Sequence, residues 1–281
     1  MRLRISPKRN LKKAQVRWIR ALVILAITLI IVFVFQQRLS AEIKENTPKE
    51  LCKLSVQQHA KSKIGGFDFS EEINCPTQQI IIKEDLTKEK EQTTAKKTIA
   101  DAMADCWEQF GEGKLDLFQG DGIFCADCSI INFENPKSSN LNGFINYYFD
   151  TKITSGPGKG KTYSEYITGL RTKPSIEKDN ISTSQSYAVM FFHIKHTNYF
   201  KAISKIIEEN PVLFAAGVST AGSVLAVGAI YKLEGGDISE LLPSEAVDRS
   251  SFVFLLPYKK ESAFKYCTYL PVKQGDWWEE T

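Results

Sequence analysis

The sequence predicts an α+β ectodomain, with a mostly antiparallel sheet packed by helices and stapled by disulfides, behind an N-terminal transmembrane helix. Three observations lead to this class. Residues 21–35, ALVILAITLIIVFVF, carry no charge. The strand-like and helix-like stretches that follow do not alternate with the regular spacing of βαβ units, which favours an antiparallel sheet. All six cysteines lie after the hydrophobic run, and disulfides form in oxidising compartments.

Residues 18–36 are expected to be a transmembrane anchor. A bilayer core about 30 Å thick needs roughly 20 apolar residues of helix, and Arg20 can extend its charged end to the headgroups. The first 20 residues hold eight Lys or Arg and no acid. The positive-inside rule therefore places residues 1–17 in the cytoplasm and the ectodomain outside the cell membrane. A cleaved secretory signal is the alternative, although residues 36–41, QQRLSA, match its cleavage site poorly.

Charge distribution separates the leader from the body of the chain. The whole chain has a net charge of +3, yet residues 21–281 carry 28 basic and 33 acidic residues, a net of −5. A mildly acidic body has no electrostatic footprint for nucleic acid. The expected partners are the lipid bilayer, through Ala21–Phe35, and other proteins at the cell surface.

Residues 37–62 are expected to form a helical stalk, with a helix start at Thr47-Pro48, and residues 63–281 to form the ectodomain. Residues 78–83, QQIIIK, predict a strand, and the charged residues 84–92 predict an exposed loop. A helix is predicted from residue 94 to 110, and Gly111 suits its C-terminal end. Its apolar residues fall on one face of a 3.6-residue period: Ile99, Met103, Cys106, Trp107 and Phe110.

Further along, strands are predicted over residues 123–133, 186–194, 251–256 and 266–270. The run 186–194, SYAVMFFHI, is hydrophobic enough to lie at the centre of the sheet. Helical segments are predicted over residues 140–149, 162–169 and 198–209, and a flexible loop over 155–161, SGPGKGK.

The segment 212–231, VLFAAGVSTAGSVLAVGAIY, has no charge, and small residues recur four positions apart in it. This spacing allows close helix packing. We expect a hydrophobic helix within the ectodomain, and a second membrane span is the alternative. A second span would place Cys267 in the cytoplasm and leave five cysteines outside.

The six cysteines, Cys52, Cys75, Cys106, Cys125, Cys128 and Cys267, are expected to form disulfides, for which fifteen pairings exist. Cys125 and Cys128 have the spacing of a redox dithiol or half a zinc site. Both lie on a predicted strand, where residues three apart point to opposite faces. We therefore expect at least one of them to bond Cys106. Zinc with Cys106 as third ligand and thiol–disulfide oxidoreductase chemistry remain alternatives.

Other motifs give no active site. Ser155 to Thr162 resembles a phosphate-binding loop, but Ser155 replaces the first glycine and Pro157 removes a backbone N–H. His193 and His196 lie three apart on a predicted strand, so they face opposite ways. Serine-nucleophile and dinucleotide motifs are absent from the sequence, and we assign no catalytic, cofactor or metal residue. Asn180-Ile181-Ser182 fits the glycosylation sequon, so Asn180 is a candidate modification site.

Two stretches carry family resemblances. Lys12-Lys13-Ala14-Gln15 before the hydrophobic run resembles the processing site of pilin-type (class III) leaders. The DCW…FGEGKL…CxxC layout resembles a family of uncharacterised archaeal membrane-anchored surface proteins. The resemblance implies a surface binding or assembly component without a known activity. A thiol–disulfide oxidoreductase using Cys125 and Cys128, or a pilin-like subunit, would be the alternatives.

Overall fold

The computed structural model describes residues 24–31, 48–61, 73–117, 121–134, 137–169, 180–195, 214–219, 249–258 and 267–268. The chain divides into two compact units, Met1–Thr47 and Pro48–Thr281. In the first unit, residues 24–31 form a helix with exposed side chains. Among the residues described, no helix combines the length and apolar character needed to cross a bilayer. Much of the predicted anchor 18–36 lies outside them, and so do residues 1–17.

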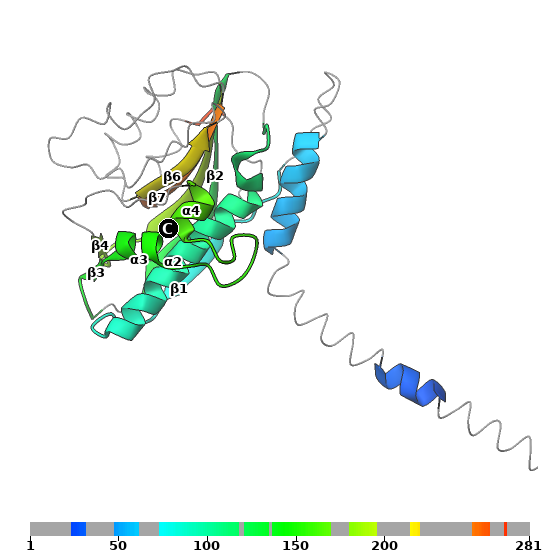
Figure 1. The fold of residues 1–281 in the computed structure, drawn as a ribbon, viewed down its shortest axis with the longest axis horizontal. Helices are drawn as coiled ribbons and strands as arrows, with labels where there is room; N and C mark the ends of the chain where they lie inside the picture. The colour runs from blue at the N-terminus through cyan, green and yellow to red at the C-terminus, as the bar shows by residue number, and fades with distance from the viewer. Residues whose placement is uncertain are drawn as a thin grey trace, which may run out of the picture. The chain divides into compact units, whose positions relative to one another are not determined.

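A five-stranded sheet forms the centre of the second unit (Figure 1). Its strands lie in the order β1 (Gln78–Ile82), β2 (Gly122–Phe133), β5 (Tyr187–Lys195), β7 (Arg249–Pro257) and β6 (Phe214–Ser219). Only β1 and β2 are parallel, and the other three pairs are antiparallel. The predicted α+β class with a mostly antiparallel sheet is confirmed, and so is the central position of β5.

Three helices cover one face of this sheet: α2 (Glu89–Gln109), α3 (Phe144–Asp150) and α4 (Tyr163–Ile167) (Figure 1). The predicted apolar stripe of α2 is buried from end to end. Phe110, which follows α2, stacks on Phe191 of β5 with ring centroids 4.5 Å apart. Trp107 also lies against Phe191, at 6.3 Å. These aromatic contacts fix α2 across the middle of the sheet.

Helix α2 begins at Glu89, five residues before the predicted start. Residues 84–92 were expected to form a loop, but those from Glu89 onward form the first turn of α2. The Gln92 side chain donates to the Leu86 carbonyl over 2.8 Å, and the Glu91 carboxylate accepts from the Asp85 N–H. Acidic residues also suit the positive end of the helix dipole.

Two predicted helices are wrong in part. Residues 214–219 of the expected helix 212–231 form strand β6, which pairs with β7. The rest of that segment lies outside the described residues, as do residues 198–209. The predicted helix 140–149 instead divides at Gly143, whose φ of 73° interrupts it. Strand β3 (Asn140–Asn142) precedes this glycine and pairs with β4 (Asn180–Ser182), and α3 follows it.

Residues 48–61 form the helix that Thr47-Pro48 predicts, but this helix belongs to the domain and not to a stalk. Cys52 and Val56 are buried in the core. The ring of His59 contacts the Leu117 carbonyl at 2.8 Å. The predicted boundary between stalk and ectodomain at residue 62 therefore lies too late, because the compact unit begins at Pro48.

The loop 155–161 is closed by its own backbone. Ile153 donates to the Lys161 carbonyl over 2.8 Å, and Gly160 donates to the Ile153 carbonyl over 3.0 Å. The backbone N–H of Lys159 donates to the Gly156 carbonyl, and that of Lys161 donates to the Gly158 carbonyl. These N–H groups are therefore occupied by the protein's own carbonyls and are not available to a phosphate.

Three disulfides join the cysteines: Cys52–Cys75, Cys106–Cys128 and Cys125–Cys267. The register of β2 against β5 shifts between Asp127 and Ser129, which makes Cys128 the extra residue of a β-bulge. Cys128 faces α2, where it bonds Cys106, as expected for one member of the CxxC pair. Cys125 bonds Cys267, and the adjacent Thr268 donates to the Ile123 carbonyl over 2.8 Å.

Candidate binding site

A cavity of about 240 Å³ lies between α2 and the β1–β2 side of the sheet. Most of its lining side chains are polar, although it lies beside the hydrophobic core. The lining comes from three elements: Gln78 and Ile80 of β1, Cys128 and Ser129 of β2, and Thr98, Asp101, Ala102, Asp105 and Gln109 of α2. Ligand sites combine such a concave surface with a few convergent polar groups.

Two polar side chains of the cavity belong to largely buried residues. Gln109 is only 4% exposed and Ser129 only 3%, and both line the cavity. A polar group that enters the cavity can therefore form hydrogen bonds with the Gln109 amide and the Ser129 hydroxyl.

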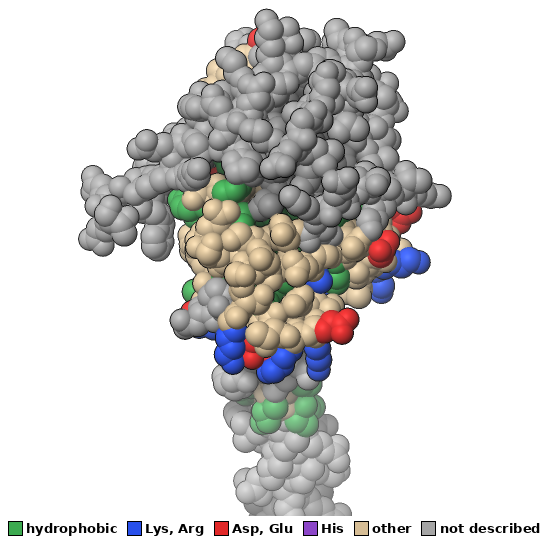
Figure 2. Space-filling model, turned by 90° about the vertical axis from the view of Figure 1, so that its left-hand side faces the viewer, with side chains coloured by type: hydrophobic (Ala, Val, Ile, Leu, Met, Phe, Trp, Pro, Cys, Tyr) green, Lys and Arg blue, Asp and Glu red, His purple; other side chains and the backbone are tan. Residues whose placement is uncertain are grey.

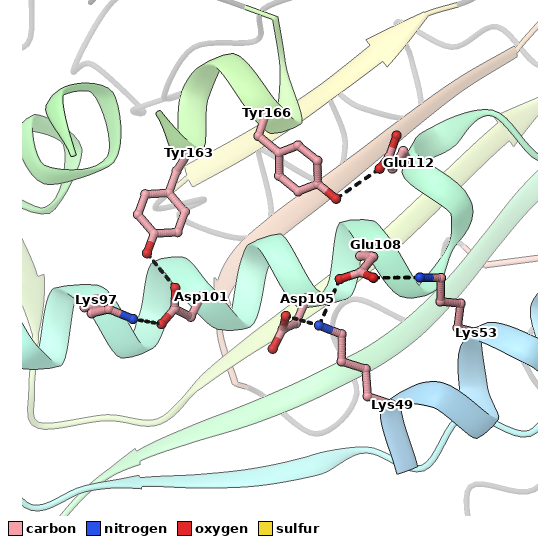
Figure 3. A network of polar contacts seen from close by, with 9 residues as sticks. All are labelled: Lys49, Lys53, Lys97, Asp101, Asp105, Glu108, Glu112, Tyr163 and Tyr166. Carbon is pink, nitrogen blue, oxygen red and sulfur yellow. Dashed lines mark hydrogen bonds and ion pairs between the residues drawn. The ribbon is translucent and has the colours of Figure 1, made fainter. Parts of the chain in front are cut away.

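Acidic residues of α2 extend from the cavity toward the C-terminal end of the helix (Figure 3). Asp101, Asp105 and Glu108 lie four and then three positions apart, which places them along one flank of α2. From the helix 48–61, Lys49 bonds Asp105 and also lies 2.9 Å from Glu108. Lys53 lies 2.7 Å from Glu108. Two lysines therefore attach the helix 48–61 to α2.

The pKa values in this cluster follow the number of partners that each group has. The pKa of Lys49 is raised, because its hydrogen bonds to Asp105 and Glu108 outweigh the effect of burial. Burial tends to raise the pKa of Glu108, but hydrogen bonds from Lys53 and Lys49 lower it overall. Burial raises the pKa of Asp105, and repulsion from Glu108 and Asp101 adds to it, so Lys49 alone does not compensate.

Tyrosines of α4 complete the polar network. The Tyr163 hydroxyl donates to Asp101, which also bonds Lys97. The Tyr166 hydroxyl donates to Glu112 over 3.2 Å. Burial, followed by these carboxylates, raises the pKa of both tyrosines far above the usual value. They are therefore neutral donors that hold α4 against α2, through Asp101, and against the turn after α2, through Glu112, and neither is poised as a base.

The candidate residues from the sequence analysis do not line this cavity, with the exception of Cys128. Cys128 lines the cavity through its disulfide with Cys106. His193 is fully buried in β5 and its Nδ1 lies 2.8 Å from the Ser251 hydroxyl, while His196 is outside the described residues. Asn180 is exposed on β4, so its glycosylation remains a prediction.

Sequence reasoning missed the cavity residues. One signal was present: Asp101, Asp105 and Glu108 recur at helical spacing directly beside the apolar stripe of α2. A charged flank on an amphipathic helix is usually a solvated face, however. Only the position of β1 and β2 turns this flank into the wall of a cavity.

In Figure 2, both basic and acidic side chains lie along the lower part of the described surface. No protein-family model, curated protein or solved structure matches this chain.

Proposed function

We propose that this chain is a membrane-anchored extracytoplasmic protein that acts as a surface binding or assembly component, with the cavity beside α2 as its binding site. The single observation that supports the binding role is the cavity itself, whose lining brings the largely buried polar residues Gln109 and Ser129 together with Asp101 and Asp105. The uncharged run 21–35 and its basic flank support the anchor and the orientation. The three disulfides suit the outer compartment.

A photo-crosslinking experiment tests the binding role. We expect the full chain with p-benzoylphenylalanine in place of Thr98, which lines the cavity, to give defined covalent products in the membranes of the cells that make it. These products disappear when Gln109→Leu is added. Lys90 of α2 is exposed and is the control position. Products that are the same from both positions, or that persist with Gln109→Leu, contradict the proposal.

The disulfide pattern weighs against the alternative of a thiol–disulfide oxidoreductase. Such an enzyme cycles through a bond between the two cysteines of its CxxC motif. Here Cys125 and Cys128 bond different partners on opposite faces of β2. Alkylation of the unreduced protein followed by mass spectrometry distinguishes the two functions. We expect no labelled cysteine, whereas rapid labelling of Cys125 and Cys128 together would favour the oxidoreductase.

The pilin-like alternative rests on Lys12-Lys13-Ala14-Gln15 alone. N-terminal sequencing of the mature protein tests it, since a processed leader gives Gln15 as the first residue. A chain that begins at Met1 removes this alternative and supports an uncleaved anchor.

A further inference from the structure

We propose that the cavity and strand β1 together bind an extended peptide segment of a partner protein, which adds to the outer edge of β1 and places a Lys or Arg side chain against Asp105. This proposal rests on the proposed function, because it names the chemistry of the partner that the cavity binds. It does not depend on the membrane anchor.

The first step is that β1 has an available edge. It is the terminal strand of the sheet that the structure describes. The Ile82 carbonyl accepts from the Glu134 N–H over 2.9 Å, so the polar groups of Ile82 face β2. Because these groups alternate along a strand of a parallel pair, those of Gln79 and Ile81 point away from β2. They can pair with an added strand.

The second step is that the five residues of β1 contain no lysine, proline or bulge. Natural edge strands are commonly blocked by lysine, proline or a bulge. Strand β1 is QQIII, without charge or proline, and its pairing with β2 is regular. Ile81 is 53% exposed on the face away from α2. This side chain offers apolar contact to an added strand.

The third step is that the cavity lies beside this edge. Gln78 and Ile80 of β1 line it, and α2 forms its opposite wall. A groove between an edge strand and a helix is a recurring mode of peptide recognition. Because alternate side chains of an added strand point to the α2 side of the sheet, one of them lies over the cavity.

The fourth step is the charge of the side chain that the cavity accepts. Asp105 has a side chain 47% exposed, and it bonds Lys49 through Oδ1 only. No described residue bonds its Oδ2. Lys49 is shared with Glu108, so Asp105 has less compensation than its neighbours. An ammonium or guanidinium group suits this carboxylate, and the Gln109 amide can add a hydrogen bond.

The test measures binding of three fluorescent heptapeptides to the full chain in detergent by anisotropy. Threonine and valine alternate in each peptide, and the central residue is lysine, norleucine or glutamate. We expect the lysine peptide to bind at least about tenfold more tightly than the other two, a typical effect of one charged contact. Asp105→Asn removes this preference, while Glu89→Gln, a charge-matched change on exposed α2 surface, retains it.

The edge is tested independently of the cavity. Ile81→Pro removes an outward N–H without removing a β1–β2 hydrogen bond, and it is expected to abolish binding of all three peptides. Ile81→Thr keeps the N–H and retains binding. Equal affinity for lysine and glutamate peptides, or unchanged binding by Ile81→Pro, overturns the inference. If crosslinking from residue 98 succeeds while all peptides fail, the inference falls and the proposed function stands.

Discussion

At the scale of single residues, Lys49 lies between two carboxylates whose pKa values shift in opposite directions. Glu108 has two lysine partners and Asp105 has one. Ionised Glu108 is therefore favoured in the folded protein, whereas ionised Asp105 has less compensation from its single lysine partner. The side chain of Asp105 is 47% exposed, so solvent screens this imbalance and its effect on stability is small.

These two carboxylates give a matched pair of variants. Glu108→Gln is expected to lower the free energy of unfolding at pH 7 by about 2 kcal/mol, because it leaves Lys53 without its partner. Asp105→Asn is expected to leave it unchanged or raise it. Urea unfolding of the full chain in detergent measures both. A loss from Asp105→Asn as large as that from Glu108→Gln contradicts this assignment.

The pH dependence has a defined sign. The pKa of Glu108 is below its usual 4.5 in the folded protein, so its stabilisation is complete above that value and is lost as pH falls through the folded pKa. Protonation of Asp105 has the opposite effect on stability, because the pKa of Asp105 in the folded protein lies above its usual 3.8. Stability measured from pH 7 to pH 3 should therefore fall less steeply for Glu108→Gln than for the wild type.

At the scale of elements, tight packing rather than loop flexibility holds the segment 155–161. Gly158 is buried, and a Cβ there would lie 2.7 Å from Cδ1 of Ile153 and 2.8 Å from Cγ of Tyr166. Tyr166 in turn binds Glu112. The loop therefore supports the position of α4 on α2.

Replacing this glycine should be costly. We expect Gly158→Ala to lower the free energy of unfolding by about 1–3 kcal/mol, which is typical of overpacking. Ser155→Ala, in the exposed part of the same loop, should have little effect. Thermal unfolding of both variants, followed by circular dichroism, checks this. Equal midpoints for Gly158→Ala and the wild type would mean that the loop can move away.

Elements with a clear hydrophobic period were predicted well from the sequence. Helix α2 and strands β2 and β5 lie within a few residues of their expected positions, since local burial decides their type. The helix predicted for 212–231 is wrong over residues 214–219, because small apolar residues fit a helix or a strand and pairing with β7 decides for the strand. The cavity was not predictable, because residues of β1, β2 and α2 line it together only in the folded protein.

At the scale of the whole molecule, the disulfides differ in how much chain they constrain. Cys125–Cys267 spans 142 residues, against 23 for Cys52–Cys75. The entropy that a crosslink removes from the unfolded chain grows with the length of the closed loop. The longer link therefore ties residue 267 to strand β2.

Removing each bond should show this difference. The double variant Cys125→Ser/Cys267→Ser is expected to lose about 5 kcal/mol of stability, and Cys52→Ser/Cys75→Ser about 3 kcal/mol, from the loop lengths alone. Urea unfolding of both proteins measures the losses. A larger loss from the Cys52–Cys75 variant would show that the helix 48–61 matters more than loop closure.

The positions of Cys125 and Cys128 on β2 also have a consequence for how the protein is made. Residues three apart on a strand point to opposite faces, and the native bonds Cys106–Cys128 and Cys125–Cys267 interleave along the chain. During synthesis Cys125 follows Cys106 before Cys128 does, and Cys267 comes last. Oxidation in the order of synthesis joins the wrong partners, which only thiol–disulfide exchange can correct. We therefore expect oxidative refolding of the reduced protein to be faster when a disulfide isomerase is present.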